Sequence, residues 1–385
     1  MYALFVACLI ALLSGTALGA RAQAPAQSGD VAPRRLGAPI TRYPGPFSAI
    51  AGVRELPNGR LLVSDAREKR VVVLGADGEV VRSIGREGRG PGEFVTPGGL
   101  YPVRGDTTYL YDRAQDRFLV IDPELRAGDT REPRGGRTGT RVSDWDPYQV
   151  DSLGRVVRQE RSVRRDPAGD EASGEWLVRY DPATARNDSI TILRLPPRTV
   201  RRDGPITVSQ EQPFGPRDAW ALAADGRVAL VRAEPYSVEW WRDGRIITRG
   251  PEVVHRPVRV MAEDRAAYQE ARQRSSARIA IGGQGGRAPT VVTPRGPGLE
   301  FPEVKAPFGS RSARIDAGGR VWVERSRPHG ATETIHDVFD GAGHLVERIA
   351  LPAGHRIVGF GHGVVYVVEK DEDDLEWLRR VPLRD

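Results

Sequence analysis

Residues 62–74, with the sequence LVSDAREKRVVVL, place an aspartate at the end of one apolar strand and an arginine at the start of the next. Residues 110–121, LYDRAQDRFLVI, repeat this order. Asp65 and Asp112 are 47 residues apart, and so are Arg70 and Arg117. A fixed period of this length is typical of a β-propeller, in which each repeat forms one small sheet.

A glycine-rich segment separates the two copies and adds a family resemblance. It runs from Gly88 to Phe94 (GRGPGEF), and PGGL follows at residues 97–100. Over residues 50–122 the chain resembles the NHL-repeat propellers, whose blades combine a glycine-rich loop, Glu-Phe, a proline, an aspartate-ended strand and an arginine-led strand. More broadly, the chain is similar to six-bladed TolB-like and NHL-like propellers, which implies a ring of six small sheets.

Turn signals divide the rest of the chain into copies of the same unit. Tight turns between strands favour glycine because they need a positive φ. Each turn is followed by a β-rich run, and the first copy predicts strands at 50–56, 60–65, 70–75 and 79–84. Three copies also carry a Pro-Phe pair eleven or twelve residues before the turn glycine, with Phe47, Phe214 and Phe308. Six turns are present, at Gly59, Asp106, Gly154, Gly226, Gly319 and Gly363.

The last copy is one strand short, which predicts how the ring closes. It supplies strands at 357–361, 364–369 and 376–383. We expect Ala38–Tyr43 to be its fourth strand, because an N-terminal strand in the last blade removes an open sheet edge. The predicted fold is therefore all-β, a six-bladed β-propeller over residues 36–385. Each blade has four antiparallel strands, and an N-terminal strand closes the ring.

The first residues indicate export. Ala3–Leu13 is an apolar run of eleven residues, and Ala20-Arg21-Ala22 follows it. The run has the length of a secretory signal core and is shorter than the ~20 residues that span a bilayer. We expect a signal peptide at 1–22, a flexible segment at 23–35, no membrane span, and a periplasmic or extracellular protein. Cys8, the only cysteine, lies in this run; a lipoprotein acylation site is the alternative to its loss on cleavage.

The fourth copy carries an insertion at residues 258–301. Residues 261–278 are polar and rich in alanine, with Glu263 and Asp264 near the start, which predicts a surface helix. A glycine-rich loop at 282–286 follows. The insertion is either a lid over the ring or a surface excursion that the fold tolerates.

Composition and motifs narrow the function classes. The net charge is +6, and acidic residues interrupt the arginine-rich region 126–202, so we expect no nucleic-acid partner. We find no phosphate-binding loop, no HExxH zinc motif and no GxSxG nucleophile elbow. Five of six histidines lie between His329 and His362, but at irregular spacing, and the acidic run 371–374 lacks the interleaved pattern of a Ca²⁺ loop. We therefore expect no metal, no cofactor and no assignable catalytic residue.

One set of ionisable residues is a candidate ligand site. Equal offsets from equivalent turns place side chains at equivalent heights along a strand. Counting six residues from each turn gives an ionisable side chain every time. These residues predict a charged ring around a central funnel that favours a cationic or mixed-charge ligand; the alternative is that they pair with neighbours such as Arg70 and Arg117. The six are Asp65, Asp112, Glu160, Arg232, Arg325 and Glu369.

The sequence thus favours an exported binding or scaffold module, expected to be a monomer, for a protein, peptide or glycan. A propeller enzyme, such as a lactonase-like hydrolase or a lyase, is the alternative, since six-bladed propellers include both. A structural role without a small ligand is the third class. Fold resemblance alone does not assign an activity.

Overall fold

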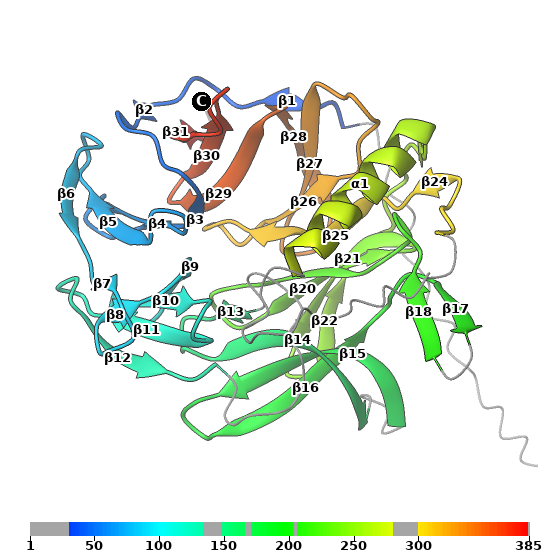
Figure 1. Ribbon diagram of the computed structural model, residues 1–385, viewed down its shortest axis with the longest axis horizontal. Helices are drawn as coiled ribbons and strands as arrows, with labels where there is room; N and C mark the ends of the chain where they lie inside the picture. The colour runs from blue at the N-terminus through cyan, green and yellow to red at the C-terminus, as the bar shows by residue number, and fades with distance from the viewer. Residues whose placement is uncertain (1–30, 134–147, 166–170, 204–205, 280–298, 384–385) are drawn as a thin grey trace, which may run out of the picture.

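The computed structural model describes residues 31–133, 148–165, 171–203, 206–279 and 299–383. In these residues six sheets of four antiparallel strands stand side by side in a ring, together with one helix (Figure 1). The predicted all-β, six-bladed propeller is confirmed. The signal peptide predicted at 1–22 and the glycine-rich loop at 282–286 lie outside the described residues.

The strands of each blade follow one another along the chain. The first two blades are β3 (Ile50–Glu55), β4 (Leu61–Asp65), β5 (Arg70–Leu74), β6 (Val80–Ser83), then β9 (Pro97–Pro102), β10 (Thr108–Asp112), β11 (Arg117–Ile121) and β12 (Ala127–Arg131). The third and fourth are β13 (Tyr148–Val150), β14 (Val156–Arg165), β15 (Glu171–Asp181), β16 (Arg186–Leu193), then β19 (Ala219–Leu222), β20 (Val228–Ala233), β21 (Tyr236–Arg242) and β22 (Arg245–Arg249). The last two are β25 (Phe308–Ile315), β26 (Val321–Arg325), β27 (Glu333–Phe339), β28 (Leu345–Pro352), then β29 (His355–Gly361), β30 (Val364–Lys370), β31 (Glu376–Pro382) and β2 (Thr41–Arg42).

Short elements outside the blades lie in the N-terminal segment and in the links between blades. They are β1 (Arg34–Arg35), β7 (Arg86–Glu87), β8 (Glu93–Phe94), β17 (Arg198–Asp203), β18 (Ile206–Glu211), β23 (Val258–Arg259), β24 (Val304–Lys305) and the helix α1 (Ala262–Ile279). The helix begins and ends one residue later than the 261–278 expected from the sequence.

The turn glycines occupy the positions that their chemistry requires. Gly59, Gly226 and Gly319 have φ angles of 77°, 84° and 78°, a region that residues with a β-carbon rarely adopt. In the fifth blade, Asp316 completes such a turn because its Oδ1 accepts hydrogen bonds from the amides of Gly318 and Arg320, both at 2.9 Å. These local signals fix the length of the turn between the first two strands of a blade.

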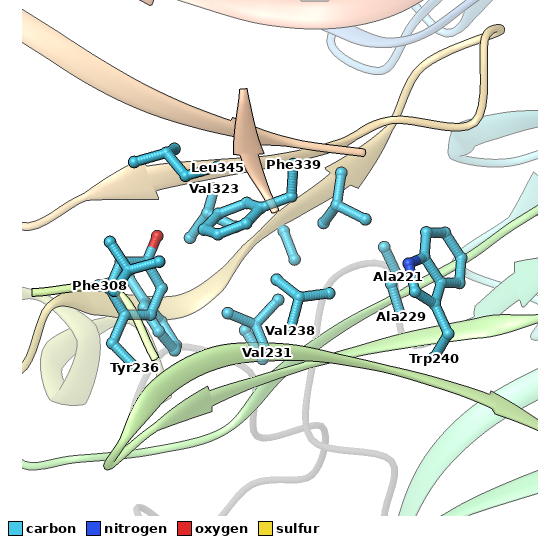
Figure 2. Packing of buried hydrophobic residues seen from close by; sticks show 14 of the residues in the cluster. Ala221, Ala229, Val231, Tyr236, Val238, Trp240, Phe308, Val323, Phe339 and Leu345 are labelled. Carbon is cyan, nitrogen blue, oxygen red and sulfur yellow. The ribbon is translucent and has the colours of Figure 1, made fainter. Parts of the chain in front are cut away.

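The hydrophobic core is divided among the contacts between neighbouring blades. Each of six buried clusters draws its side chains from two adjacent blades. Between the fourth and fifth blades, Val231 and Val238 face Val323 and Phe339, as Figure 2 shows. Because every sheet is buried on both faces, middle strands such as β4, β5 and β20 are buried along almost their whole length.

The ring is closed by a strand from the N-terminus, as predicted. Thr41 and Arg42 pair with Arg380 and Arg379 of β31. The amides of Ile40 and Tyr43 extend the ladder to the carbonyls of Arg380 and Leu378. The Tyr43 side chain is buried between the last and first blades. The predicted strand Ala38–Tyr43 therefore contains β2 and its flanking hydrogen bonds.

A second N-terminal strand covers the neighbouring blade. Arg34 and Arg35 form β1, which pairs in parallel with β28 at the outer edge of the fifth blade. Arg34 forms an ion pair with Glu347 and donates a hydrogen bond of 2.8 Å to the carbonyl of Leu383. The N-terminal segment thus binds both the fifth and the last blade, next to the C-terminal end.

The two faces of the ring differ in the length of their connections. On one side, which we call the turn face, the first strand joins the second and the third joins the fourth through two to five residues. The opposite side, the loop face, carries the links from blade to blade. Two of these links are long, residues 194–218 and 250–307, and they include β17, β18 and α1. In Figure 1 these elements lie on the right of the ring.

A buried histidine predicts acid sensitivity of the fold. His336 is 5% exposed, lies 6.3 Å from the ring of Trp322, and burial together with the nearby Arg314 lowers its pKa to about 4. In the unfolded chain its pKa is near 6.5, so the unfolded state binds the proton first as pH falls. We expect stability to be complete above pH 6.5 and to fall toward pH 4, by up to about 3 kcal/mol.

Denaturant unfolding between pH 7 and 4 measures this effect. The pH dependence of wild type minus that of His336→Gln isolates the histidine from the carboxylates that titrate in the same range. Parallel curves for the two proteins would show that His336 does not carry the effect.

Candidate functional site

The structure places the six predicted ring residues at similar heights in their blades. Asp65, Asp112, Arg325 and Glu369 lie opposite the first residues of the innermost strands, Ile50, Pro97, Phe308 and His355. Arg232 lies one residue beyond such a pair, and Glu160 two. The register inferred from the turns therefore gives one shared strand position in four blades and positions within two residues of it in the other two, whereas the role of these residues in binding a ligand stays a prediction.

The two aspartates of the set contact the backbone. Asp65 and Asp112 are both 0% exposed. Asp65 accepts hydrogen bonds from the amides of Ser48 (2.9 Å) and Ala49 (3.1 Å), just before β3. Asp112 accepts the equivalent pair from Val95 and Thr96, both at 3.1 Å. The nearest nitrogens of Arg70 and Arg117 stand 3.9 Å away, so the backbone amides are the primary partners.

Two arginines of the set contact the residue that precedes the first strand of their blade, as the aspartates do, but with a positive charge. Arg325 donates through Nε to the carbonyl of Pro307, the residue before β25, and through Nη1 to buried Asp337. Arg232 donates through Nη1 to Asp218, the residue before β19. In four blades, the end of the second strand therefore fixes the chain that enters the first strand.

The remaining two residues form ion pairs within their own blades. Glu160 is buried and accepts from Nε and Nη2 of Arg158, both at 3.0 Å. Glu369 is partly exposed and pairs with Arg379 of β31. Their contacts differ from those of the other four.

A second group of residues lies on the loop face, beside α1. Phe214 does not enter a blade core as Phe47 and Phe308 do, although all three share the Pro-Phe spacing. It has a φ of 59° and packs against Tyr268 of α1 and Phe301, with ring centroids 5.6 and 6.0 Å away. The Pro-Phe pair at Phe214 therefore holds the insertion instead of packing into a blade.

A buried ion pair fixes the start of the helix to the ring. Lys305 Nζ lies 2.7 Å from Asp264 Oδ1 and donates a second hydrogen bond to the carbonyl of Arg327, at 2.8 Å. Asp264 also accepts from the amide of Met261, which caps the helix N-terminus. Burial acts to raise the pKa of Asp264, but the bonds from Lys305 and Met261 outweigh it and lower the pKa.

Glu211 joins three segments of the loop face. It is contacted by Arg217, by Arg198 of β17 at 3.5 Å and by Arg161 of β14 at 3.8 Å. Arg161 also reaches Glu175 of β15 at 3.5 Å. The long hairpin of the third blade and the β17–β18 hairpin are thus linked through one carboxylate.

The exposed part of α1 bears on the two interpretations of the insertion. In α1, Asp264 is buried and Tyr268 half-buried, whereas the other residues as far as Arg274 are exposed. The helix is therefore attached by its first two turns and presents a polar surface over residues 269–274. This attachment argues against a loose excursion and does not by itself make α1 a lid.

A pocket of about 320 Å³ lies beside this attachment, in the connection between β26 and β27. Its lining includes Arg325, Ser326, Arg327, Thr332 and Glu333. Arg327 joins the two features, because its carbonyl accepts the hydrogen bond from Lys305. Of the six residues predicted from the sequence, Arg325 is the one that lines this pocket.

The candidate metal residues of the sequence have other contacts. His329 Nδ1 lies 3.9 Å from Asp264, and His344 Nδ1 lies 3.5 Å from Asp340. Asp371, the first residue of the acidic run, accepts from the indole of Trp377 and the amide of Leu375. In the described ranges, no three His, Cys, Asp or Glu side chains gather in a way that could hold a metal, and no described helix is long and apolar enough to cross a membrane.

Sequence reasoning did not identify the Phe214, Lys305 and Glu211 contacts. One signal was available for the lysine: Lys305 is one of three lysines in a chain whose other basic residues are arginines. For Glu211 there was none, because its partners come from three segments that only the fold brings together.

Comparisons with individual known proteins find solved structures of low sequence identity. No curated protein matches the sequence. A protein from Bacteroides fragilis assigned as exported is 12% identical, with 92% of this chain and 95% of that chain covered and a TM-score of 0.45. A gluconolactonase from Xanthomonas campestris is 13% identical (94% and 99%, TM-score 0.43), and a calcium-binding regucalcin from Agrobacterium tumefaciens 12% (91% and 97%, TM-score 0.40). At these TM-scores the likenesses carry no argument about fold or function.

The family comparison covers the part of the chain where the repeat is clearest. The finer resemblance to NHL-repeat and TolB-like propellers stays a prediction. Residues 45–124 match the model of a family described as "6-bladed beta-propeller", which agrees with the ring that the strands form.

Proposed function

We propose that the chain is an exported binding module that engages a protein, peptide or glycan through its loop face. The observation that carries the proposal is the asymmetry of the ring. Turn-face connections have two to five residues, whereas the loop face carries two long links with their own strands and helix. Loops on a rigid scaffold are where binding residues concentrate.

The contacts of these links support a preformed surface. The Lys305–Asp264 ion pair is buried, the Phe214, Tyr268 and Phe301 rings pack together, and Glu211 holds three arginines. Ring closure by β2 needs none of these contacts. A surface ordered before binding loses less conformational entropy when a ligand arrives.

Removing the insertion tests the proposal. The amide of Val260 donates to the carbonyl of Glu303, so residues 261–302 can be replaced by a short Gly-Asn turn between β23 and β24. Lys305→Met in the same chain avoids a buried unpaired charge. We expect the excised protein to retain the thermal unfolding midpoint of the ring within a few degrees and to lose the signals that wild type gives on glycan and peptide arrays.

A variant of the turn face is the matched control. Arg245→Glu changes an exposed residue at the turn between β21 and β22 and should leave the array signals unchanged. Equal signals from the excised protein and wild type would contradict the proposal. One tightly bound metal ion per purified chain would instead favour the alternative of a propeller hydrolase or lyase.

A further inference from the structure

The pocket in the fifth blade has a chemistry more specific than that of the loop face as a whole. It lies between the end of β26 and the start of β27, with a volume of about 320 Å³. That volume is at the lower end of the range for small-molecule sites. Two arginines, Arg325 and Arg327, line it together with the Ser326 and Thr332 hydroxyls and the apolar side chains of Pro328 and Ile335.

Both arginines are held in place by other groups. Arg325 is fixed by Asp337 at 3.1 Å and by the carbonyl of Pro307 at 3.3 Å, and 12% of its side chain is exposed. Arg327 donates through Nη1 to Thr334 Oγ1 at 2.9 Å. A guanidinium that is already oriented loses less entropy when it binds a carboxylate, and its planar fork matches the two carboxylate oxygens.

The charges around the pocket do not balance. Asp337 serves two arginines, since Arg348 Nε also donates to it at 2.8 Å. Glu333 is paired with Arg35 of β1 at 2.7 Å. Among the residues that the structure describes, Arg327 has no carboxylate partner. The Arg327 guanidinium is thus a positive charge at the pocket that Asp337 and Glu333, each paired with another arginine, do not neutralise.

A neighbouring histidine responds to the same charge. His255 packs edge-on against Tyr236, over whose ring the Arg325 guanidinium stands at 5.6 Å. Burial lowers the pKa of His255, and the charge of Arg325 lowers it further. The hydrogen bond to the Val253 backbone and the charges of Asp337 and Glu252 act in the opposite direction, but the pKa of His255 stays lowered.

We propose that this pocket binds the carboxylate of a hydroxylated acid of the uronic-acid type, free or as the end unit of a glycan, with Arg327 and Arg325 on the carboxylate. The serine and threonine hydroxyls suit sugar hydroxyls, and Pro328 and Ile335 offer an apolar surface to the sugar ring. The assignment rests on the loop face being the binding face, and it names the ligand class of that face.

Calorimetric titration of the whole protein tests the assignment with three probes. Glucuronate should bind, whereas glucose, which has no carboxylate, and acetate, which has no sugar ring, should each bind at least about tenfold more weakly. Arg327→Gln, on an exposed side chain, should weaken glucuronate binding about tenfold. Arg327→Lys should give an intermediate affinity, because it keeps the charge and loses the fork. Arg245→Gln on the turn face is the control and should bind as wild type does.

Other outcomes would overturn the assignment. If glucose binds as tightly as glucuronate, the arginines do not recognise a carboxylate. If acetate binds as tightly as glucuronate, the pocket does not recognise the sugar ring. The assignment is also wrong if glucuronate does not bind, or if Arg327→Gln binds it as tightly as wild type does. This holds even if the array signals still depend on residues 261–302. Loss of that dependence instead ends the proposed function, so the two failures can be told apart.

Discussion

A chain that begins at residue 46 should lose at least about 5 kcal/mol of unfolding free energy relative to wild type. It lacks β2, and with it the buried Tyr43 side chain and the hydrogen bonds of residues 40–43 to β31. Loss of a buried aromatic side chain costs about 3–5 kcal/mol, and each backbone hydrogen bond about 1 kcal/mol more. The open edge of β31 should also promote aggregation. Urea unfolding monitored by tryptophan fluorescence measures the loss.

A chain that begins at residue 36 separates the two N-terminal strands. It lacks β1, whose pairing with β28 involves two residues, and keeps β2. We expect a loss of about 1–2 kcal/mol for this control. If both shortened chains unfold at the same urea concentration, ring closure does not depend on β2.

Changing Asp65 and Asp112 to asparagine in one chain should destabilise the fold by about 4 kcal/mol. Each carboxylate accepts backbone amides with both of its oxygens, which the asparagine side chain cannot do. One NH₂ group per site must then face a backbone N–H, and a buried donor without an acceptor costs about 1–3 kcal/mol. Denaturant unfolding measures the effect, and it should be larger for the Asp65 single variant, because Asp65 also accepts the amides of Arg67 and Glu68.

Asp77→Asn is the matched control for this pair. Asp77 accepts a single backbone amide, from Glu79, in an exposed turn, and we expect its replacement to change stability little. A double variant that is as stable as wild type but binds the loop-face ligand more weakly would show that Asp65 and Asp112 act as ligand-binding groups.

The ring could be predicted from the sequence because its signals are local and repeated. The glycine turns, the 47-residue spacing and the missing last strand each follow from how one blade is made. Closure by residues 38–43 followed from counting strands. The start of a first strand is harder to predict: β25 begins at Phe308, but a shift in register between Phe308 and Ala313 interrupts its pairing with β26.

The loop face could not be predicted in the same way because its contacts join distant segments. Glu211 meets Arg161 across 50 positions of sequence, and Lys305 meets Asp264 across 41. The Pro-Phe spacing made Phe214 equivalent to Phe47 and Phe308, whereas it packs against α1. The six charged residues lie within two residues of one strand position, but strand period does not tell which partners they meet.

The pairing of residue 41 with residue 380 also sets an order on biosynthesis. Strand β2 is synthesised well before its partner β31. Until β31 has been synthesised, Tyr43 and Phe47 have no last blade to pack against. Apolar side chains that stay exposed during folding promote aggregation. The entropy of joining such distant ends grows only logarithmically with their separation, but long-range pairing slows folding. A ribosome that stops before residue 376 therefore releases a ring that cannot close.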